Sequence, residues 1–335
     1  MKKLFAFLLL ATVLSHCGKT KNSTIRAINP VSVKNLTGDL SLGRYLLTCS
    51  DSHLIASDNK TNKISIFNYN GLAASQVIGR TGRGPGEFNN LMYTAADGNH
   101  LYVADPGNRR IAVFNMDDWS LDSTITKISS TTRFAAAGGY LYLFAPRAGN
   151  PSPFMKVDTG HKDHKSVTYF GKWMNPKRPR GWEQYILLFY HHTVIAVSKL
   201  KPIVKFYNEN GKLLSMQNLA KDRALAQALA YKKRFRQNPA NRRSAVILFQ
   251  DAAIFTNNLI LNFNMHINKR KYTSNNYLVY RINGNQLQKV GAFKTNIHGG
   301  FTHTFCIHGN KLYSNGGSGG INIFTFDLSF LNNHK

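Results

Sequence analysis

Short runs of apolar residues separated by polar turns recur along most of the chain. The segment 53–58 reads HLIASD and is followed by KISIFN at 63–68, and a close copy of this pair begins at His100. Within the runs, apolar residues such as Ile64 and Ile66 alternate with polar neighbours, which is typical of half-buried β-strands. The pattern therefore predicts many short strands.

Six copies of this strand pair are visible. Their starting residues are Leu54, Leu101, Leu141, Val194, Leu259 and Leu312. The mean spacing is about 52 residues, a period that fits one blade of four short strands. We predict an all-β six-bladed β-propeller that occupies residues 24–335.

The last copy and the N-terminal region complement each other. The sixth copy continues through a strand at 321–327 and has no fourth strand after it. The stretch 24–33 is extended and belongs to no repeat. We expect it to close the ring as the outer strand of the sixth blade, which would cover an otherwise exposed sheet edge.

One segment interrupts the period. Residues 219–235 are rich in alanine, with Leu225, Leu229 and Phe235 at helical spacings, and Pro239 ends the pattern. We predict a short helical insertion at about 219–243, between blades four and five.

The N-terminal residues are typical of an export signal. Lys2 and Lys3 precede an apolar run at 4–14, which is too short to span a bilayer. The run ends in LSHCG, which resembles the lipobox of bacterial lipoproteins and implies lipidation of Cys17. We expect a signal peptide at 1–16 and a polar tether at 17–23; the alternative is an ordinary secretory signal that is cut nearby.

This reading places the protein in a bacterial cell envelope, anchored to a membrane by the lipid on Cys17. Gly18 follows the cysteine, and it is not the aspartate associated with inner-membrane retention in some bacteria. The outer membrane is therefore favoured over the inner one.

A glycine-rich loop joins the first two blades. The segment 79–88, GRTGRGPGEF, together with LYVAD at 101–105 and NRRIAVF at 108–114, resembles an NHL repeat. The whole chain resembles the TolB-like six-bladed propeller lipoproteins of Bacteroidota, a resemblance that implies a family mostly without an assigned activity. The loop lacks a following Lys-Ser/Thr and its glycines suit tight turns, so we interpret it as structural rather than phosphate-binding. Its key residues are Gly79, Gly82, Gly84, Pro85, Gly86, Glu87 and Phe88.

The charge is strongly unbalanced. The chain has 43 Lys and Arg against 16 Asp and Glu, a formal net charge of +27, which favours an anionic partner or surface. Successive strands of a blade alternate in direction, so the loops between second and third strands share one face with the connections between blades. More than half of the basic residues fall on these loops, and we call this side the basic face.

Two groups of residues on the basic face are candidates for binding. The candidate anion-binding residues are Lys177, Arg178, Arg180, Lys232, Lys233, Arg234, Arg236, Lys269, Arg270 and Lys271. Trp173 and Trp182 bracket the first of these clusters and are candidates for stacking on sugars or bases. The alternative is a solvated surface that lies near anionic lipid headgroups. We expect an acidic glycan, lipopolysaccharide or an acidic protein as partner, whereas export argues against nucleic acid; the protein itself is expected to be a monomer.

The sequence contains few candidates for catalytic residues. We expect the innermost strands near 46–50, 91–96, 132–137, 184–190, 254–256 and 303–307, and these segments contain no Asp or Glu. A calcium site needs several oxygen ligands, and the adjacent His191 and His192 would point to opposite faces of a strand. We therefore predict no catalytic residue, metal or cofactor and expect a binding or scaffold module. The alternative is a propeller hydrolase or lyase that acts on a sugar or lactone.

Cys49 and Cys306 each lie at the end of an innermost strand, on the two blades that meet where the ring closes. Export would permit a disulfide between them. Equivalent positions on neighbouring blades are expected to be too far apart for that bond, so we predict two buried thiols.

Overall fold

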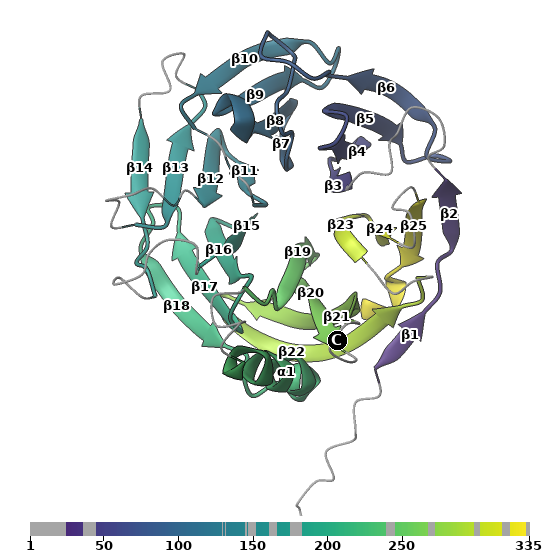
Figure 1. Cartoon of the computed structure of the whole chain (residues 1–335), viewed down its shortest axis with the longest axis vertical. Helices are drawn as coiled ribbons and strands as arrows, with labels where there is room; N and C mark the ends of the chain where they lie inside the picture. The colour runs from purple at the N-terminus through teal and green to yellow at the C-terminus, as the bar shows by residue number, and fades with distance from the viewer. Residues whose placement is uncertain are drawn as a thin grey trace, which may run out of the picture.

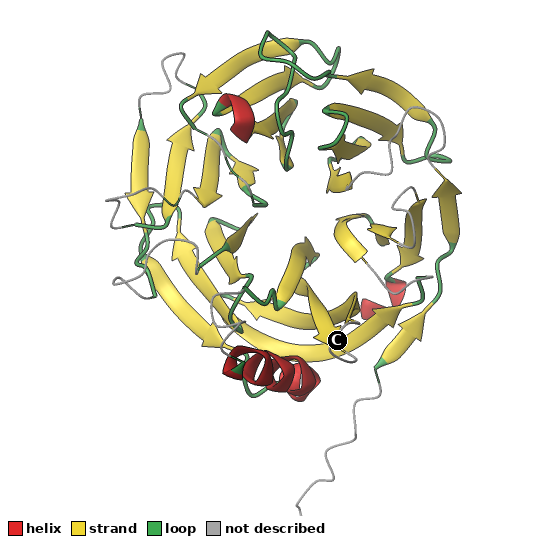
Figure 2. Cartoon of the chain, in the orientation of Figure 1, coloured by secondary structure: helices red, strands yellow, loops and turns green. Residues whose placement is uncertain are grey.

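The structure is a computed structural model that describes residues 25–35, 45–128, 130, 132–144, 146, 152–160, 166–174, 183–238, 245–266, 272–297, 302–316 and 322–332. Six β-sheets surround a central axis and form a closed ring (Figures 1 and 2). The predicted six-bladed β-propeller is confirmed.

Four blades are four-stranded antiparallel sheets built from consecutive strands, with the first strand innermost. The first has β3 (Tyr45–Cys49), β4 (His53–Asp58), β5 (Lys63–Asn68) and β6 (Ala74–Ile78). The next has β7 (Thr94–Asp97), β8 (His100–Asp105), β9 (Arg110–Asn115) and β10 (Leu121–Thr126), with the 3₁₀ turn η1 (Pro106–Asn108) after β8. The third has β11 (Ala135–Ala137), β12 (Tyr140–Phe144), β13 (Phe154–Asp158) and β14 (Val167–Phe170). The fourth has β15 (Tyr185–Tyr190), β16 (Thr193–Ser198), β17 (Ile203–Asn208) and β18 (Leu213–Asn218).

The remaining two blades share the N-terminal segment. β19 (Phe249–Phe255), β20 (Asn258–His266), β21 (Tyr272–Asn283) and β22 (Gln286–Thr295) form one blade, and β23 (Thr302–His308), β24 (Lys311–Gly316) and β25 (Asn322–Asp327) form the other, followed by η4 (Ser329–Leu331). β2 (Ser32–Asn35) pairs with β25, so an N-terminal strand closes the ring as predicted, although only Ser32 and Val33 of this strand belong to the predicted stretch 24–33. β1 (Arg26–Ile28) pairs in parallel with β22 and adds a fifth strand to the neighbouring blade, which the sequence pattern did not predict (Figure 1).

The predicted helical insertion lies between β18 and β19. It consists of η2 (Arg223–Leu225) and α1 (Ala226–Gln237), and the helix ends at Asn238 just before Pro239. With the blade that holds β2 as number one, the helix lies between blades five and six, not four and five. The predicted blade numbers are one lower because they start at the first complete repeat. In the described part of the chain, no helix has the length and apolar character needed to cross a membrane.

Most of the strands are buried on both faces. In β5, Ser65 is as inaccessible as its neighbours Ile64 and Ile66, and in β9 the same is true of Ala112. The expectation of half-buried strands is therefore wrong for the middle of each blade. The reason is architectural, because a propeller blade has another blade packed against each of its faces.

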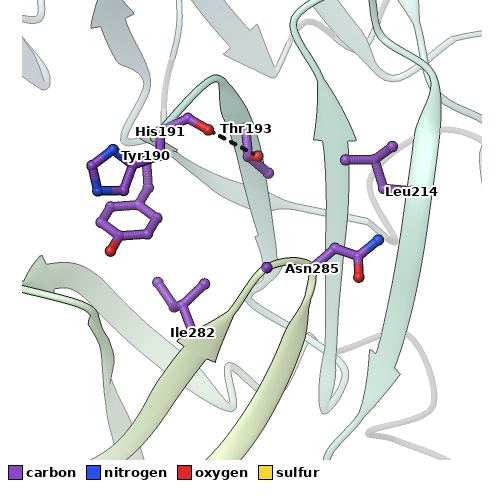
Figure 3. Close-up of a pocket in the computed structure, with 7 residues that line it drawn as sticks. Tyr190, His191, Thr193, Leu214, Ile282 and Asn285 are labelled. Atoms are coloured by element: carbon purple, nitrogen blue, oxygen red, sulfur yellow. Dashed lines mark hydrogen bonds between the residues drawn. The ribbon is translucent and has the colours of Figure 1, made fainter.

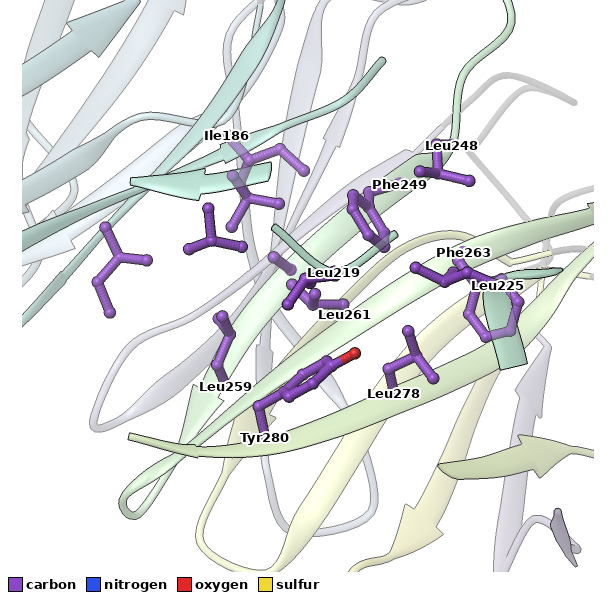
Figure 4. Packing of buried hydrophobic residues seen from close by; sticks show 14 of the residues in the cluster. Ile186, Leu219, Leu225, Leu248, Phe249, Leu259, Leu261, Phe263, Leu278 and Tyr280 are labelled. Carbon is purple, nitrogen blue, oxygen red and sulfur yellow. The ribbon is translucent and has the colours of Figure 1, made fainter. Parts of the chain in front are cut away.

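The core consists of separate apolar clusters, one at each contact between neighbouring blades. The largest lies between the β15–β18 blade and the β19–β22 blade, where Ile186 faces Leu259 and Leu261 (Figure 4). Leu225 and Ala228 from the helical insertion belong to this cluster. Burial of these two side chains fixes α1 at the rim of the ring (Figure 1).

Candidate functional site

Helix α1 presents four basic residues, and two of them face solvent. Its sequence, AQALAYKKRFRQ, contains no acidic residue. Lys233 and Arg234 are exposed, whereas Lys232 and Arg236 are partly buried on the side of the helix that faces the protein. The helix therefore divides its charges between an outer pair and an inner pair.

The Lys232 side chain is directed inward. Its Nζ donates to the backbone carbonyl oxygens of Leu200 and Val246, the latter at 3.0 Å. Burial, together with the nearby positive charges of Arg236 and Lys201, lowers the pKa of Lys232 to about 8. Lys232 was expected on the open surface with its neighbours, and the structure places it against the body of the propeller instead.

Two further lysines are buried close to this region. Lys205 donates from Nζ to the carbonyl oxygen of Lys172 at 3.2 Å, and Lys199 is only 8% exposed. Burial lowers the pKa of both ammonium groups; the carboxylates of Glu183 and Asp251, respectively, act in the opposite direction. The sequence pattern gives no sign that Lys205 is buried, because its strand has the pattern of an ordinary apolar run.

Trp173 is not available for stacking on a ligand. It is 8% exposed and packs edge-on against Phe144 in the cluster between two blades. Its place in the core removes both faces of the indole from solvent. The other candidates Lys177, Arg178, Arg180, Trp182, Lys269, Arg270 and Lys271 lie outside the described residues.

An ion pair occupies the centre of the ring. Arg133, just before β11, donates from Nε and Nη2 to the two carboxylate oxygens of Asp251 on β19, both at 2.7 Å. Nη2 also reaches the carbonyl oxygens of Leu47 at 3.1 Å and Phe305 at 2.9 Å. Burial would lower the pKa of Arg133, but the Asp251 carboxylate outweighs it and leaves that pKa raised.

The absence of acids from the innermost strands was a wrong expectation. β19 begins at Phe249 and therefore includes Asp251, and β7 ends with Asp97. The error arose because β19 starts several residues earlier than its apolar pattern indicates. Asp251 also accepts hydrogen bonds from the backbone N–H groups of Ala252 and Phe305, so both of its oxygens are engaged. Within the described ranges, no group of three or more His, Cys, Asp or Glu side chains could hold a metal ion.

Cys49 and Cys306 form a disulfide, which corrects the prediction of two thiols. Their Cα atoms lie 5.5 Å apart, within the range that the bond allows. β3 and β23 are innermost strands of neighbouring blades and approach each other closely near the axis, as the hydrogen bond from Leu47 N to Thr304 Oγ1 at 2.9 Å shows. The expected separation was too large because blades converge toward the centre of the ring.

The glycine-rich loop is held by hydrogen bonds within the protein. Glu87 accepts from the N–H of Gly84 at 2.7 Å and from Arg80 Nε at 2.9 Å. Arg110 donates to the carbonyl oxygens of Gly84 and Glu87 and forms an ion pair with buried Asp105 at 3.0 Å. A Cβ on Gly82 would lie 2.1 Å from the Glu87 carboxylate, which explains the glycine there.

Phe88 fixes the other end of this loop. Its side chain is fully buried between two blades, and a Cβ on Gly79, where φ is +86°, would meet its ring at 2.5 Å. In the described structure Gly84 and Gly86 complete the turn around Pro85, and Gly86 has φ of +70°. This arrangement joins two blades, and internal acceptors take up the N–H groups of Gly82, Gly84, Glu87 and Phe88.

A groove of about 550 Å³ lies on the side opposite the basic face, beside the turns at 191–192 and 284–285. Tyr190, Ile282 and Leu214 supply most of its apolar lining (Figure 3). The nearby His192 pairs with Glu209 at 2.7 Å in an exposed position. Neither His192 nor Glu209 is among the residues that line the groove.

Similar folds are found among known proteins, with low sequence identity. A family model described as "6-bladed beta-propeller" matches residues 36–177. A putative exported protein from Bacteroides fragilis is 12% identical, with 90% of this chain and 99% of that chain covered and a TM-score of 0.51. A protein of unknown function from Bacteroides thetaiotaomicron is 10% identical over 91% of this chain and 75% of that one, also with a TM-score of 0.51.

The fold is also similar to that of a further solved structure. The structure of U3-55K is 12% identical, covers 90% of this chain and 100% of that chain, and has a TM-score of 0.55. No curated protein has a sequence that matches this chain. At such identities the solved structures support the fold alone: the chain is a six-bladed β-propeller.

Proposed function

We propose that this protein is an exported, lipid-anchored binding module whose basic face recognises an anionic partner outside the cytoplasm. The observation that carries the proposal is the outer pair on α1, Lys233 and Arg234, which is exposed on a helix without a single acidic residue. Exposed cations of this kind bind weakly as individuals but strongly as a group. An acidic glycan, lipopolysaccharide or an acidic protein would satisfy such a surface.

The acids on the basic face support the proposal because they are engaged within the protein. Asp58, Asp105 and Glu183 are almost inaccessible to solvent. Glu87 binds Arg80, and Asp222 binds Lys289. The positive charge on this side is therefore not cancelled locally by free carboxylates of the described residues.

Exposed acids lie on the other side of the ring. Asp51 follows β3, and Asp117 and Asp118 lie in the turn between β9 and β10, all of them open to solvent. A protein polarised in this way orients its basic face toward a negatively charged surface. Attachment through Cys17, which lies outside the described residues, would hold the ring close to lipid headgroups.

The axis of the ring supports a binding role over the alternative hydrolase or lyase. Asp251 is a buried carboxylate at the axis, and Arg133 together with two backbone N–H groups takes up its oxygens. A carboxylate held in this way is unsuited to proton transfer, since its lone pairs are already occupied.

The test is a comparison of two charge-reversed variants. Lys233→Glu with Arg234→Glu changes the exposed cations of α1, while Lys212→Glu with Lys311→Glu makes the same change in net charge at exposed positions on the opposite side. Binding to immobilised heparin and to lipopolysaccharide vesicles is measured at about 50 and 500 mM salt. We expect the α1 variant to lose most of its low-salt affinity and the control to retain it. Equal losses of affinity in the two variants would show that binding depends on net charge alone and would refute a localised site.

A further inference from the structure

Three cations converge behind the exposed surface of α1. Lys232 and Arg236 are four residues apart, so they lie on the same face of the helix. The carbonyl oxygen of Leu200 accepts a hydrogen bond from Lys232, which brings the helix against the turn that carries Lys201, between β16 and β17. The inner face of α1 and this turn together form a small basic site.

The charges of this site have no counter-ion among the residues that the structure describes. No carboxylate there forms an ion pair with Lys201, Lys232 or Arg236. The Lys201 ammonium group contacts the Met174 sulfur at 4.0 Å, and a thioether sulfur is a weak acceptor. In the sequence, no acidic residue occurs between α1 and Asp251.

Free donors remain in the site. The Nε of Arg236 is buried and has no hydrogen-bond partner within the described part of the chain. An ammonium group has three donors, and Lys232 uses two of them on backbone carbonyls. Like charges at positions i and i+4 destabilise a helix, and a buried donor without an acceptor has a cost in free energy. An anion bound at this point would relieve both costs.

We propose that Lys201, Lys232 and Arg236 bind a tetrahedral oxyanion, a phosphate or sulfate group carried by the anionic partner. This inference rests on the proposed function and names a subsite within it. Donors that come from two separate elements approach the anion from different directions. A tetrahedral group with three free oxygens can accept from all three residues, whereas a planar carboxylate offers two oxygens in one plane.

The protonation state of Lys232 gives the site a measurable signature. Burial lowers the pKa of this lysine to about 8, with Arg236 on the same helix and Lys201 on the facing turn as the charged groups that act in the same direction. A bound anion favours the ammonium form and raises this pKa. Binding near pH 8 should therefore take up a proton, and the affinity should fall as the pH rises above 8.

The experiment measures inorganic phosphate, sulfate and acetate binding to the full propeller by calorimetry at pH 7 and pH 9. We expect phosphate or sulfate to bind and acetate to bind much more weakly, with proton uptake near pH 8 detected in buffers of different ionisation enthalpy. Lys232→Met and Arg236→Gln should each lower the affinity about tenfold or more, as the loss of one charge-assisted hydrogen bond predicts. Lys212→Met and Lys311→Met, at exposed positions on the opposite side of the ring, are the matched controls and should change it less than about twofold.

The two proposals fail in different ways. Equal affinities for acetate and phosphate, or unchanged phosphate binding in both inner-face variants with their melting temperatures preserved, would overturn the subsite. Lys201 lies outside the helix, so Lys201→Met should also lower the phosphate affinity even if an inner-face variant unfolds α1. Phosphate binding without any heparin binding retains the subsite and refutes the extended polyanion surface. Heparin binding without phosphate binding retains the surface and refutes the subsite.

Discussion

Arg133, just before β11, and Asp251, on β19, come from different blades and meet at the axis of the ring. They form a bidentate ion pair with both N–O distances at 2.7 Å. The same guanidinium binds backbone carbonyls of β3 and β23, and the carbonyl oxygen of Arg133 accepts from Leu187 N on β15 at 3.0 Å. One residue therefore links its own blade to four others. The pair therefore stabilises the contacts between blades at the centre of the propeller.

Removal of one partner of this pair should be strongly destabilising, because it leaves a buried charge without compensation. We expect Arg133→Met or Asp251→Asn to lower the free energy of unfolding by about 3–5 kcal/mol, measured by denaturant titration. The double variant Arg133→Met with Asp251→Leu should recover part of that loss. Arg80→Met, which breaks an ion pair whose arginine side chain is 78% exposed, is the control and should cost less than about 1 kcal/mol. A single variant at Arg133 that is as stable as this control would contradict the stabilising role of the ion pair.

The disulfide should contribute strongly to stability because it links two neighbouring blades across a sequence separation of 257 residues. We expect Cys49→Ser with Cys306→Ser to lower the free energy of unfolding by about 2–5 kcal/mol. A reducing agent should bring the natural protein to the same level and leave the variant unchanged. Mass spectrometry of a non-reduced digest should show the linked peptides; two free thiols in the folded, oxidised protein would contradict the bond.

The N-terminal strands should be needed for a closed ring. Without residues 25–35, the outer edges of β22 and β25 would be unpaired and the buried side chain of Ile28 would be lost. We expect a protein that begins at residue 36 to lose about 2 kcal/mol or more and to aggregate, compared with one that begins at residue 25. Equal thermal melting of the two proteins and equal monomer fractions in gel filtration would show that closure does not depend on this segment.

The attachment of the helical insertion should depend on pH through Asp222. This carboxylate accepts from the N–H of Ala224 at 2.9 Å, from Tyr280 and from Lys289. Burial would raise the pKa of Asp222, but the hydrogen bonds from Lys289 and Tyr280 outweigh it and hold that pKa below the ordinary value of 3.8. A lowered carboxyl pKa contributes stability above the ordinary value, and this stability is lost as the pH falls through the folded-state value.

Asp222→Asn should therefore cost about 1–3 kcal/mol at pH 7, and the difference from the natural protein should shrink below pH 4. Denaturant titrations at pH 7 and pH 3 measure both values. Lys289→Met should show the same trend, since it removes the partner of the same carboxylate. A difference that is as large at pH 3 as at pH 7 would contradict a contribution from the ionised group.

Lipidation of Cys17 remains a prediction from the N-terminal sequence. We expect Cys17→Ser to leave an unprocessed or soluble form, because the acyl chains have no other attachment point in the predicted lipobox. Detergent partitioning and the mass of the mature protein measure the outcome. If the variant enters the detergent phase with the same mature mass as the natural protein, the lipobox interpretation is wrong.

The sequence by itself determined the repeat and the elements it contains. Recurrence of segments such as 53–58 and 63–68 encodes strand, turn and strand locally, and the alanine-rich stretch before Pro239 encodes a helix. Pairing of the N-terminal segment with β25 also follows from the pattern, because a sixth blade with three strands leaves one edge to cover. These features depend on neighbours in sequence or on the completeness of the repeat.

Only the tertiary structure decided which residues meet across the ring and which side of a helix faces the protein. Arg133 and Asp251 are separated by 118 residues, and no local pattern joins them. Cys49 and Cys306 lie within bonding distance because blades converge toward the axis, and Lys232 turns inward because Leu225 and Ala228 fix the rotation of the insertion. Periodicity specifies the strands of each blade, whereas contacts at the axis and the orientation of α1 depend on how all six blades pack together.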